Sequence, residues 1–102
     1  MIIYNVTVKI SHEKHDDWLK WMKTVHIPEV MATGKFTNNV FSKVMIDDDE
    51  GTNYSIQYHC DCMEILDDYQ TNHAPKLRED FAARYKDHFV AFRTLLDVVE
   101  WR

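Results

Sequence analysis

The sequence predicts one α+β domain over residues 1–102, in which a four-stranded antiparallel sheet carries two helices on one face in the ferredoxin-like order β-α-β-β-α-β. Three observations support this prediction. Four segments alternate apolar and polar residues as strands do, and two longer segments have apolar residues three or four apart as helices do. An acidic turn joins two strand–helix–strand halves, which right-handed crossovers would interleave into one sheet.

Residues 2–10 predict the first strand, because apolar and polar side chains alternate along them. Successive side chains of a strand point to opposite faces, so a strand with this pattern is buried on one face only. Its apolar face consists of Ile2, Tyr4, Val6, Val8 and Ile10.

The first helix is expected after Ser11, a residue type that caps the free N–H groups at a helix N-terminus. Pro28 interrupts or restarts this helix, because proline has no N–H to donate. Gly34 is placed to end it. The apolar face of this helix consists of Trp18, Leu19, Met22 and Val25.

The second strand is predicted over residues 35–46 and the third over residues 54–60, with an acidic turn at 47–53 between them. Asp and Gly supply the turn chemistry, and the carboxylate spacing does not match a calcium-binding EF-hand loop. In the second strand we expect Phe41 and Met45 on the face opposite the main apolar set. That set consists of Phe36, Val40, Val44 and Ile46.

A second helical region over about residues 63–86 and a last strand over about residues 90–101 complete the predicted order. Each helical region carries a His-x-Pro break in its later part, beginning at His26 in the first and at His73 in the second. The chain therefore has an internal repeat, in which each half contains one strand, one broken helix and one further strand.

The face of the sheet that the helices do not cover must contact water, a ligand or a partner. The last strand has large apolar side chains on both faces, and Phe41 and Met45 add two more in the second strand. Strands that are apolar on both faces are usually buried on both. We therefore expect a homodimer joined largely through the sheets.

The strand and helix order, the two-sided strands and the His-x-Pro breaks resemble the dimeric α/β-barrel superfamily. This group includes antibiotic-biosynthesis monooxygenases, muconolactone isomerases, haem-degrading enzymes and proteins of the ethyl-tert-butyl-ether-degradation type. The chain resembles more closely a family of short bacterial proteins known only as a domain of unknown function, and this resemblance covers nearly its full length. The segments that carry it are residues 18–22 (Trp-Leu-Lys-Trp-Met) and 26–31 (His-Ile-Pro-Glu-Val-Met). The resemblance implies a dimeric α/β barrel with a pocket between sheet and helices. It does not define a reaction, because one fold hosts many chemistries.

Polar and aromatic residues at the predicted pocket are candidates for a functional site. His26 and His73 are the candidate catalytic residues, since imidazole exchanges protons near neutral pH; alternatively, they bond to carbonyl groups freed by the proline breaks. Arg93 has apolar neighbours on its strand, so it either binds an anionic substrate or forms an ion pair with Asp97 of this chain or of a partner. Trp18 either lines the pocket or packs in the core. The candidate ligand-binding residues are Asn5, Gln57, His59, Arg93 and Trp18.

Several classes of protein are excluded by composition. The formal net charge is −5 and no run of Lys and Arg occurs, so we predict no nucleic-acid binding. No apolar run approaches the ~20 residues of a membrane-spanning helix, and the first residues lack a signal-peptide pattern, so we expect a cytoplasmic protein without membrane contact. Cys60 and Cys62 lack the partners of a zinc site and are expected to be ordinary thiols. We predict no metal site and no cofactor, since Asn5 and His73 match only part of the pattern of the haem-degrading enzymes.

Three functions are compatible with this sequence. The first is a homodimeric domain that binds a small apolar or aromatic molecule. The second is a cofactor-independent monooxygenase or isomerase acting on an aromatic or polyketide-like compound. The third is a structural or regulatory dimer with a filled core. A cavity that holds His26, His73 or His59 beside aromatic side chains favours the first two, and a solid core favours the third.

Overall fold

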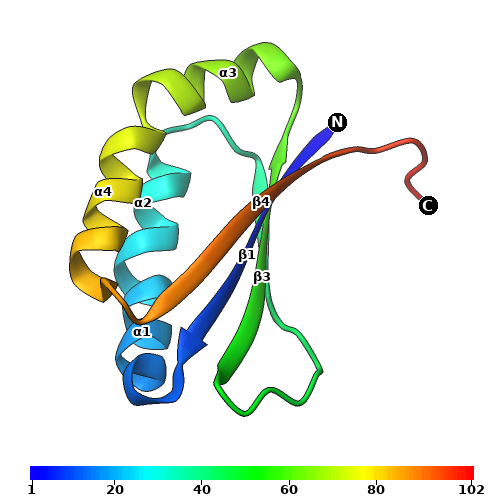
Figure 1. Ribbon diagram of the computed structural model, residues 1–102. Helices are drawn as coiled ribbons and strands as arrows, with labels where there is room; N and C mark the ends of the chain where they lie inside the picture. Colours follow the sequence, from blue (N-terminus) through cyan, green and yellow to red (C-terminus); the bar gives the residue numbers. More distant parts are fainter.

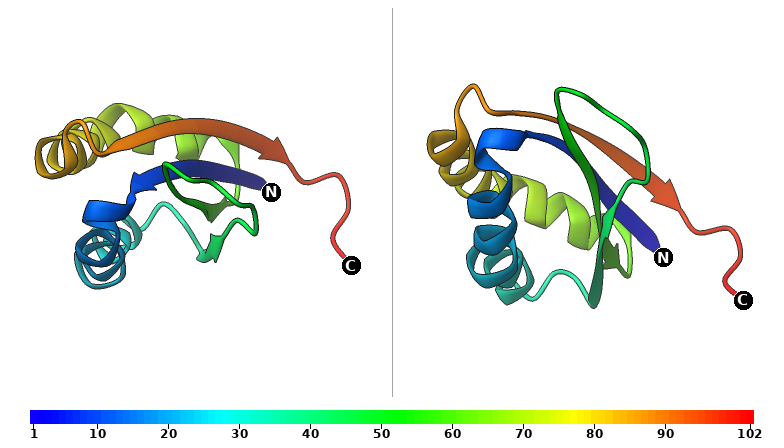
Figure 2. Two further views of the ribbon diagram at one scale, coloured as in Figure 1. Left: turned by 60° about the horizontal axis from the view of Figure 1, so that its bottom comes forward. Right: turned by 90° about the horizontal axis from the view of Figure 1, so that it is seen from below.

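The computed structural model describes residues 1–102 and has the predicted ferredoxin-like fold, with the helices gathered on one side of the sheet (Figures 1 and 2). The sheet order is β2-β3-β1-β4, and all pairings are antiparallel. Because β2 and β4 are free edges, the sheet of one chain is open, and closing a barrel requires a second copy. The strands are β1 (Ile2–Ser11), β2 (Asn38–Lys43), β3 (Gly51–Cys60) and β4 (Phe89–Asp97).

The first helical region is continuous but changes its winding along its length. It starts as a 3-10 turn (His12–Lys14) and continues as α1 (His15–Trp21), a π-helical segment (Met22–His26) and α2 (Ile27–Ala32). Wide π-helical turns are rare and frequently occur at functional sites. Pro28 lies in the first turn of α2 and has no N–H to donate to a carbonyl of the preceding turn. The interruption predicted at this proline is therefore the π-helical segment that precedes it.

The second helical region is divided into two separate helices, α3 (Met63–Asn72) and α4 (Ala74–Tyr85), which run in different directions (Figure 1). His73 joins them with φ −123° and ψ −44°, outside the helical range. Pro75 lies in the first turn of α4, as Pro28 does in α2. The break predicted from the second His-x-Pro is thus present and is sharper than the first.

The register of the sheet sends the even-numbered side chains of β1 towards the helices. Tyr4 lies opposite Tyr58 of β3 and Leu95 of β4, and Val8 lies opposite Tyr54 and Ala91. These side chains and the inner faces of the helices form one hydrophobic core. Burial of each large apolar side chain contributes about 1.5–3 kcal/mol. The largest fully buried side chains are Trp18, Tyr85, Ile10, Met22, Ile56, Leu66, Val8, Val30 and Cys60.

The face predicted for Phe41 is wrong. Phe41 lies opposite Ile56 and packs edge-on against Trp18 with ring centroids 5.7 Å apart, so it belongs to the core. The predicted strand over 35–46 began too early: Phe36 precedes the first residue of β2, and its position does not follow the alternation of the strand. Met45 lies beyond the end of β2 and is 95% exposed.

Strand β4 is shorter than predicted, because its pairing with β1 ends at Asp97 and not at Trp101. The N–H of Val98 still donates to the carbonyl of Met1 at 2.9 Å, and the chain then leaves the sheet (Figure 1). Trp101 nevertheless contacts the sheet, since its ring lies edge-on to His59 with centroids 5.9 Å apart.

Strand β3 begins earlier than predicted, at Gly51, which the sequence placed in the turn. A Cβ atom at this position would overlap the carbonyl oxygen of Ile10, so the absence of a side chain permits the close approach of β3 to β1. The acidic turn therefore ends at Glu50.

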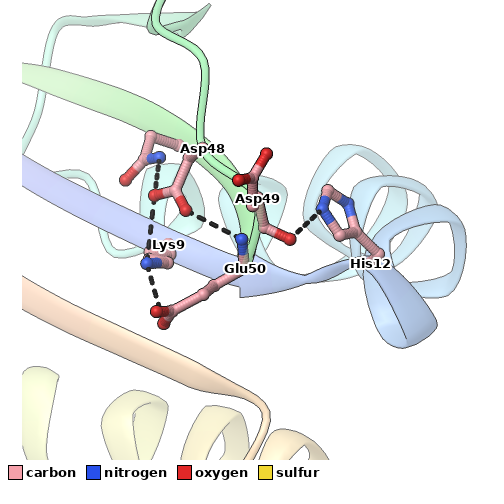
Figure 3. A network of polar contacts seen from close by, with 6 residues as sticks. Lys9, His12, Asp48, Asp49 and Glu50 are labelled. Carbon is pink, nitrogen blue, oxygen red and sulfur yellow. Dashed lines mark hydrogen bonds and ion pairs between the residues drawn. The ribbon is translucent and has the colours of Figure 1, made fainter.

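Polar contacts attach the acidic turn to β1 (Figure 3). Lys9 Nζ lies 3.0 Å from the carboxylate of Asp48 and 3.3 Å from that of Glu50. The side chain of Asn53 and the N–H of Glu50 also donate to Asp48, each at 3.0 Å. Hydrogen bonds from Asn53, Lys9 and the Glu50 backbone lower the pKa of Asp48 to about 2. The ring of His12 lies 3.2 Å from a carbonyl oxygen of the turn.

The structure holds no group of three or more His, Cys, Asp and Glu side chains arranged to bind a metal ion. None of its helices is both long enough and apolar enough to pass through a membrane.

Candidate functional site

A partly enclosed cavity of about 50 Å³ lies between the sheet and the helices. This volume accommodates several water-sized groups, since about 10–15 Å³ is enough for one. Twelve of the fifteen side chains that line it are hydrophobic, and they come from β1, β3, β4, the π-helical segment and helices α2, α3 and α4. The other three are His26, Arg78 and Arg93.

The hydroxyl group of Tyr4 accepts hydrogen bonds from the two arginines that line the cavity. Arg78 Nη2 of α4 donates to it at 3.1 Å, and Arg93 Nε of β4 donates to it at 3.0 Å. Arg78 Nη2 also donates to the side-chain oxygen of Gln70 on α3. Tyr4 and Arg93 can meet because they lie on neighbouring strands and point to the same face of the sheet. Two cationic groups are thereby held at one phenol oxygen.

The aromatic ring of Tyr4 is fixed by other rings. It stacks on Phe36 and on Tyr58, each with centroids 6.0 Å apart, and lies tilted against Tyr69 at 5.9 Å. Burial raises the pKa of both Tyr58 and Tyr69, so these phenols are neutral at physiological pH. The wall around the two arginines therefore contributes no negative charge.

His26 ends the π-helical segment and lines the cavity. Its ring stacks on Trp21 with centroids 4.9 Å apart and meets the edge of Phe81 at 5.4 Å. Burial lowers its pKa to about 4; Asp80 opposes this effect and Arg93 adds to it. The imidazole is therefore neutral at pH 7, and its buried Nδ1 has no hydrogen-bond partner.

His73, the second candidate catalytic residue, does not line the cavity. It lies at the junction of α3 and α4, where its ring stacks on Tyr69 with centroids 6.3 Å apart. Its backbone N–H donates to the carbonyl of Tyr69 at 2.9 Å. The structure therefore separates the two histidines of the His-x-Pro repeat, and only His26 contacts the cavity.

Three candidate ligand-binding residues lie on the opposite face of the sheet from the cavity. Asn5 and Gln57 are cross-strand neighbours there, and Asn5 accepts a hydrogen bond from Ser55 at 2.6 Å and donates one to Thr7 at 3.1 Å. His59 shares this open face and is only 6% exposed. These side chains form a polar row on the open face, apart from the cavity.

Trp18 and Arg93 have different positions. Trp18 is fully buried in the core, does not line the cavity, and its Nε1 has no hydrogen-bond partner. Arg93 lines the cavity and bonds to Tyr4. The alternative ion pair of Arg93 with Asp97 is not formed within the chain.

Sequence reasoning missed Tyr4 and Arg78 as site residues. The sequence does carry a signal for Arg78. It lies four residues after Ala74 and three residues before Phe81, and this spacing places it on the buried face of the helix. A charged side chain on the apolar stripe of a helix must reach a polar group or a ligand. Tyr4 gave no such signal, since a tyrosine on the apolar face of a strand is an ordinary core residue.

The architecture is that of a ferredoxin-like α+β protein, and solved structures share it over nearly their whole length. A protein of Deinococcus radiodurans assigned as an antibiotic biosynthesis monooxygenase matches with a TM-score of 0.71 at 16% identity, covering 100% of this chain and 96% of that one. A dimeric ferredoxin-like protein from an uncultured marine organism matches with 0.70 at 14% identity, covering 100% and 98%. SnoaB, a cofactor-independent oxygenase of Streptomyces nogalater, matches with 0.68 at 7% identity, covering 98% and 95%. At these identities the similarity shows the fold alone.

Within this fold, the chain belongs to the family described as a domain of unknown function, DUF4286, whose model matches residues 1–99. This match and the shared fold confirm the predicted resemblance to an uncharacterised family related in structure to antibiotic biosynthesis monooxygenases. No curated protein is similar to the chain in sequence.

Proposed function

We propose that the protein is a homodimeric small-molecule-binding domain whose ligand occupies the cavity between sheet and helices. One observation carries the proposal: Tyr4, His26, Arg78 and Arg93 converge on a cavity of about 50 Å³ with otherwise apolar walls. Ligand pockets typically combine apolar walls with a few convergent polar groups. A core that served packing alone would fill this space, and two buried polar atoms without partners, Nδ1 of His26 and Nε of Arg78, belong to residues that line it.

A binding test can be made specific for the cavity by filling it. Ala91 lines the cavity from β4, so Ala91→Leu would occupy part of the space, whereas Ala83→Leu changes an exposed position of α4 as a control. Small aromatic compounds screened by amide NMR should shift residues of β1, β4 and α4, and Ala91→Leu should abolish these shifts. Shifts confined to the open face, or none at all, would contradict the proposal and favour a structural dimer.

The second copy is proposed to cover the open face of the sheet. Val40, Val90, Phe92 and Leu96 point to this face and are exposed, Phe92 by 59%. Val40 lies on edge strand β2 and the other three lie on the opposite edge strand, β4; exposed apolar side chains on a sheet are typical of an interface. The solved dimeric ferredoxin-like protein shares this fold, which supports the same kind of assembly here.

Sedimentation at micromolar concentration tests the homodimer. The native chain should sediment as a dimer, and Phe92→Lys should give monomers, because a charge would be buried in the interface. Val99→Lys is the matched control, since Val99 is 97% exposed and lies beyond the end of β4. A monomeric native chain would refute the assembly.

A cofactor-independent monooxygenase or isomerase is the second candidate. The unpaired Nδ1 of His26 favours it, since a neutral imidazole beside two cationic groups can take a proton and leave an anion held by the arginines. Its pKa of about 4 makes His26 a weak base near neutral pH, and this favours binding over catalysis. Oxygen uptake with quinol and polyketide substrates tests the alternative, and uptake that survives His26→Ala and His73→Ala would exclude both histidines from the reaction.

We also propose a cytoplasmic location. The chain has two cysteines, Cys60 and Cys62, and both are free thiols, which is compatible with a reducing compartment. Cell fractionation with an antibody to the protein tests this, and recovery outside the cytoplasmic fraction would contradict it.

A further inference from the structure

We infer that the ligand is a small anion, a carboxylate or comparably acidic molecule, whose negative group binds to Arg78, Arg93 and the Tyr4 hydroxyl. The inference rests on the proposed function, because it names the chemical class of the ligand for the same cavity.

The first argument is the missing countercharge at the two arginines. Neither guanidinium lies within 4.0 Å of a carboxylate, although the chain has 17 Asp and Glu against 12 Lys and Arg. Guanidinium groups stay charged in proteins, and the charge of the half-buried Arg78 needs a partner, whereas Arg93 is also open to water. By contrast, the other two arginines of the chain, Arg84 and Arg102, form ion pairs with carboxylates.

The second argument is the unused hydrogen-bond donors. The oxygen of Tyr4 accepts from both arginines, so its lone pairs are occupied, and its own O–H donates to no group of the chain. Arg78 Nε is buried without a hydrogen-bond partner. An acceptor with several lone pairs would satisfy these donors, and a carboxylate is the commonest group of this kind.

The third argument is the composition and access of the cavity. No Asp or Glu is among the lining residues, so an anion would meet no repulsion from the wall. Aromatic and aliphatic walls suit an acid attached to one ring, and about 50 Å³ sets a small size. Arg93 lies on the edge strand β4 and is exposed as a residue, so one of the two cations can be reached from solvent.

The test compares benzoate with benzamide, which has nearly the same shape but no charge, in amide NMR titrations of the native chain. Benzoate should bind about tenfold or more tightly than benzamide, because hydrogen bonds to charged groups exceed neutral ones by this order. Added salt should weaken benzoate binding and leave benzamide unaffected.

Variants of the two arginines test whether the preference for benzoate over benzamide depends on them. Arg78→Gln and Arg93→Gln should each weaken benzoate by about tenfold and leave benzamide unchanged. Arg84→Gln is the matched control, since Arg84 lies on the same helix, pairs with Asp17 and does not line the cavity. If Arg78→Gln does not fold, the comparison of benzoate with benzamide on the native chain still decides.

The possible contrary results separate failure of the anionic ligand from failure of the proposed function. Equal binding of benzoate and benzamide in the cavity overturns the anionic ligand and leaves the proposed function standing. Binding of neither probe nor any small aromatic compound overturns both. Arginine variants that dissociate the homodimer while benzoate affinity stays unchanged would show that a carboxylate of the partner chain neutralises the arginines, which also overturns the inference.

Discussion

The hydroxyl of Tyr4 holds two cationic side chains, and Tyr4→Phe removes this oxygen alone. Tyr4 is 3% exposed and its ring packs against Phe36 and Tyr58, so its packing should survive the change. Two guanidinium N–H groups lose their acceptor, and a hydrogen bond to a charged group contributes about 1.5–3 kcal/mol. Arg93 is exposed and can turn to water, and Arg78 keeps its bond to a second acceptor. We therefore expect a loss of about 1–2 kcal/mol in the free energy of unfolding.

Urea unfolding at one fixed protein concentration measures this loss, since the stability of a dimer depends on concentration. Tyr69→Phe is the matched control: it removes a hydroxyl from the same aromatic cluster, and that hydroxyl forms no hydrogen bond within the chain. Equal losses in Tyr4→Phe and Tyr69→Phe would refute the argument that the Tyr4 oxygen positions the two arginines.

Three further predictions concern pH and backbone geometry. Folding lowers the pKa of His26 from 6.5 to about 4, so the unfolded chain binds the extra proton, and the free energy of unfolding should fall by up to about 3 kcal/mol from pH 6.5 to 4. Urea titrations at several pH values should show that the free energy of unfolding of His26→Gln depends less on pH than that of the native chain. The pKa of Asp48 is lowered to about 2, so its stabilising effect is present above about pH 4 and disappears towards pH 2. Unfolding followed by circular dichroism should show that Asp48→Asn no longer loses this part of its stability as the pH falls. Gly51→Ala should lower the melting temperature more than Gly34→Ala. A Cβ at Gly51 would overlap the backbone carbonyl of Ile10, whereas Gly34→Ala adds only the strain of a side chain at φ +76°, with nothing within 4 Å of the Cβ.

The fold was predictable because its signals are local. Alternation in β1 assigns Tyr4 and Val8 to the helix face, where the structure places them. The same method failed in β2, because the alternation was counted from Phe36, which precedes the strand. Pairing of Phe41 with Ile56 determines the face in β2, and this is a contact between distant parts of the chain. The exposed apolar side chains of the open face therefore come from Val40 and residues of β4 rather than from Phe41 and Met45.

The site was predictable only in part. Arg93 was identified because a charge among apolar neighbours needs a partner, and the structure provides Tyr4 as that partner. The repeat of His-x-Pro suggested two equivalent histidines, but a π-helical segment directs His26 to the cavity while His73 joins two helices outside it. Such a wide turn has no sequence signal in this chain beyond Pro28, which follows it.

A crystal structure of the native protein grown with 4-bromobenzoate tests the central claim most directly, because the anomalous signal of bromine locates the ligand. The account predicts one ligand per chain in the cavity, with its carboxylate at Arg78 and Arg93 and its ring against the aromatic wall. Bromine found only on the open face of the sheet, or in the cavity with the carboxylate turned away from both arginines, would contradict it.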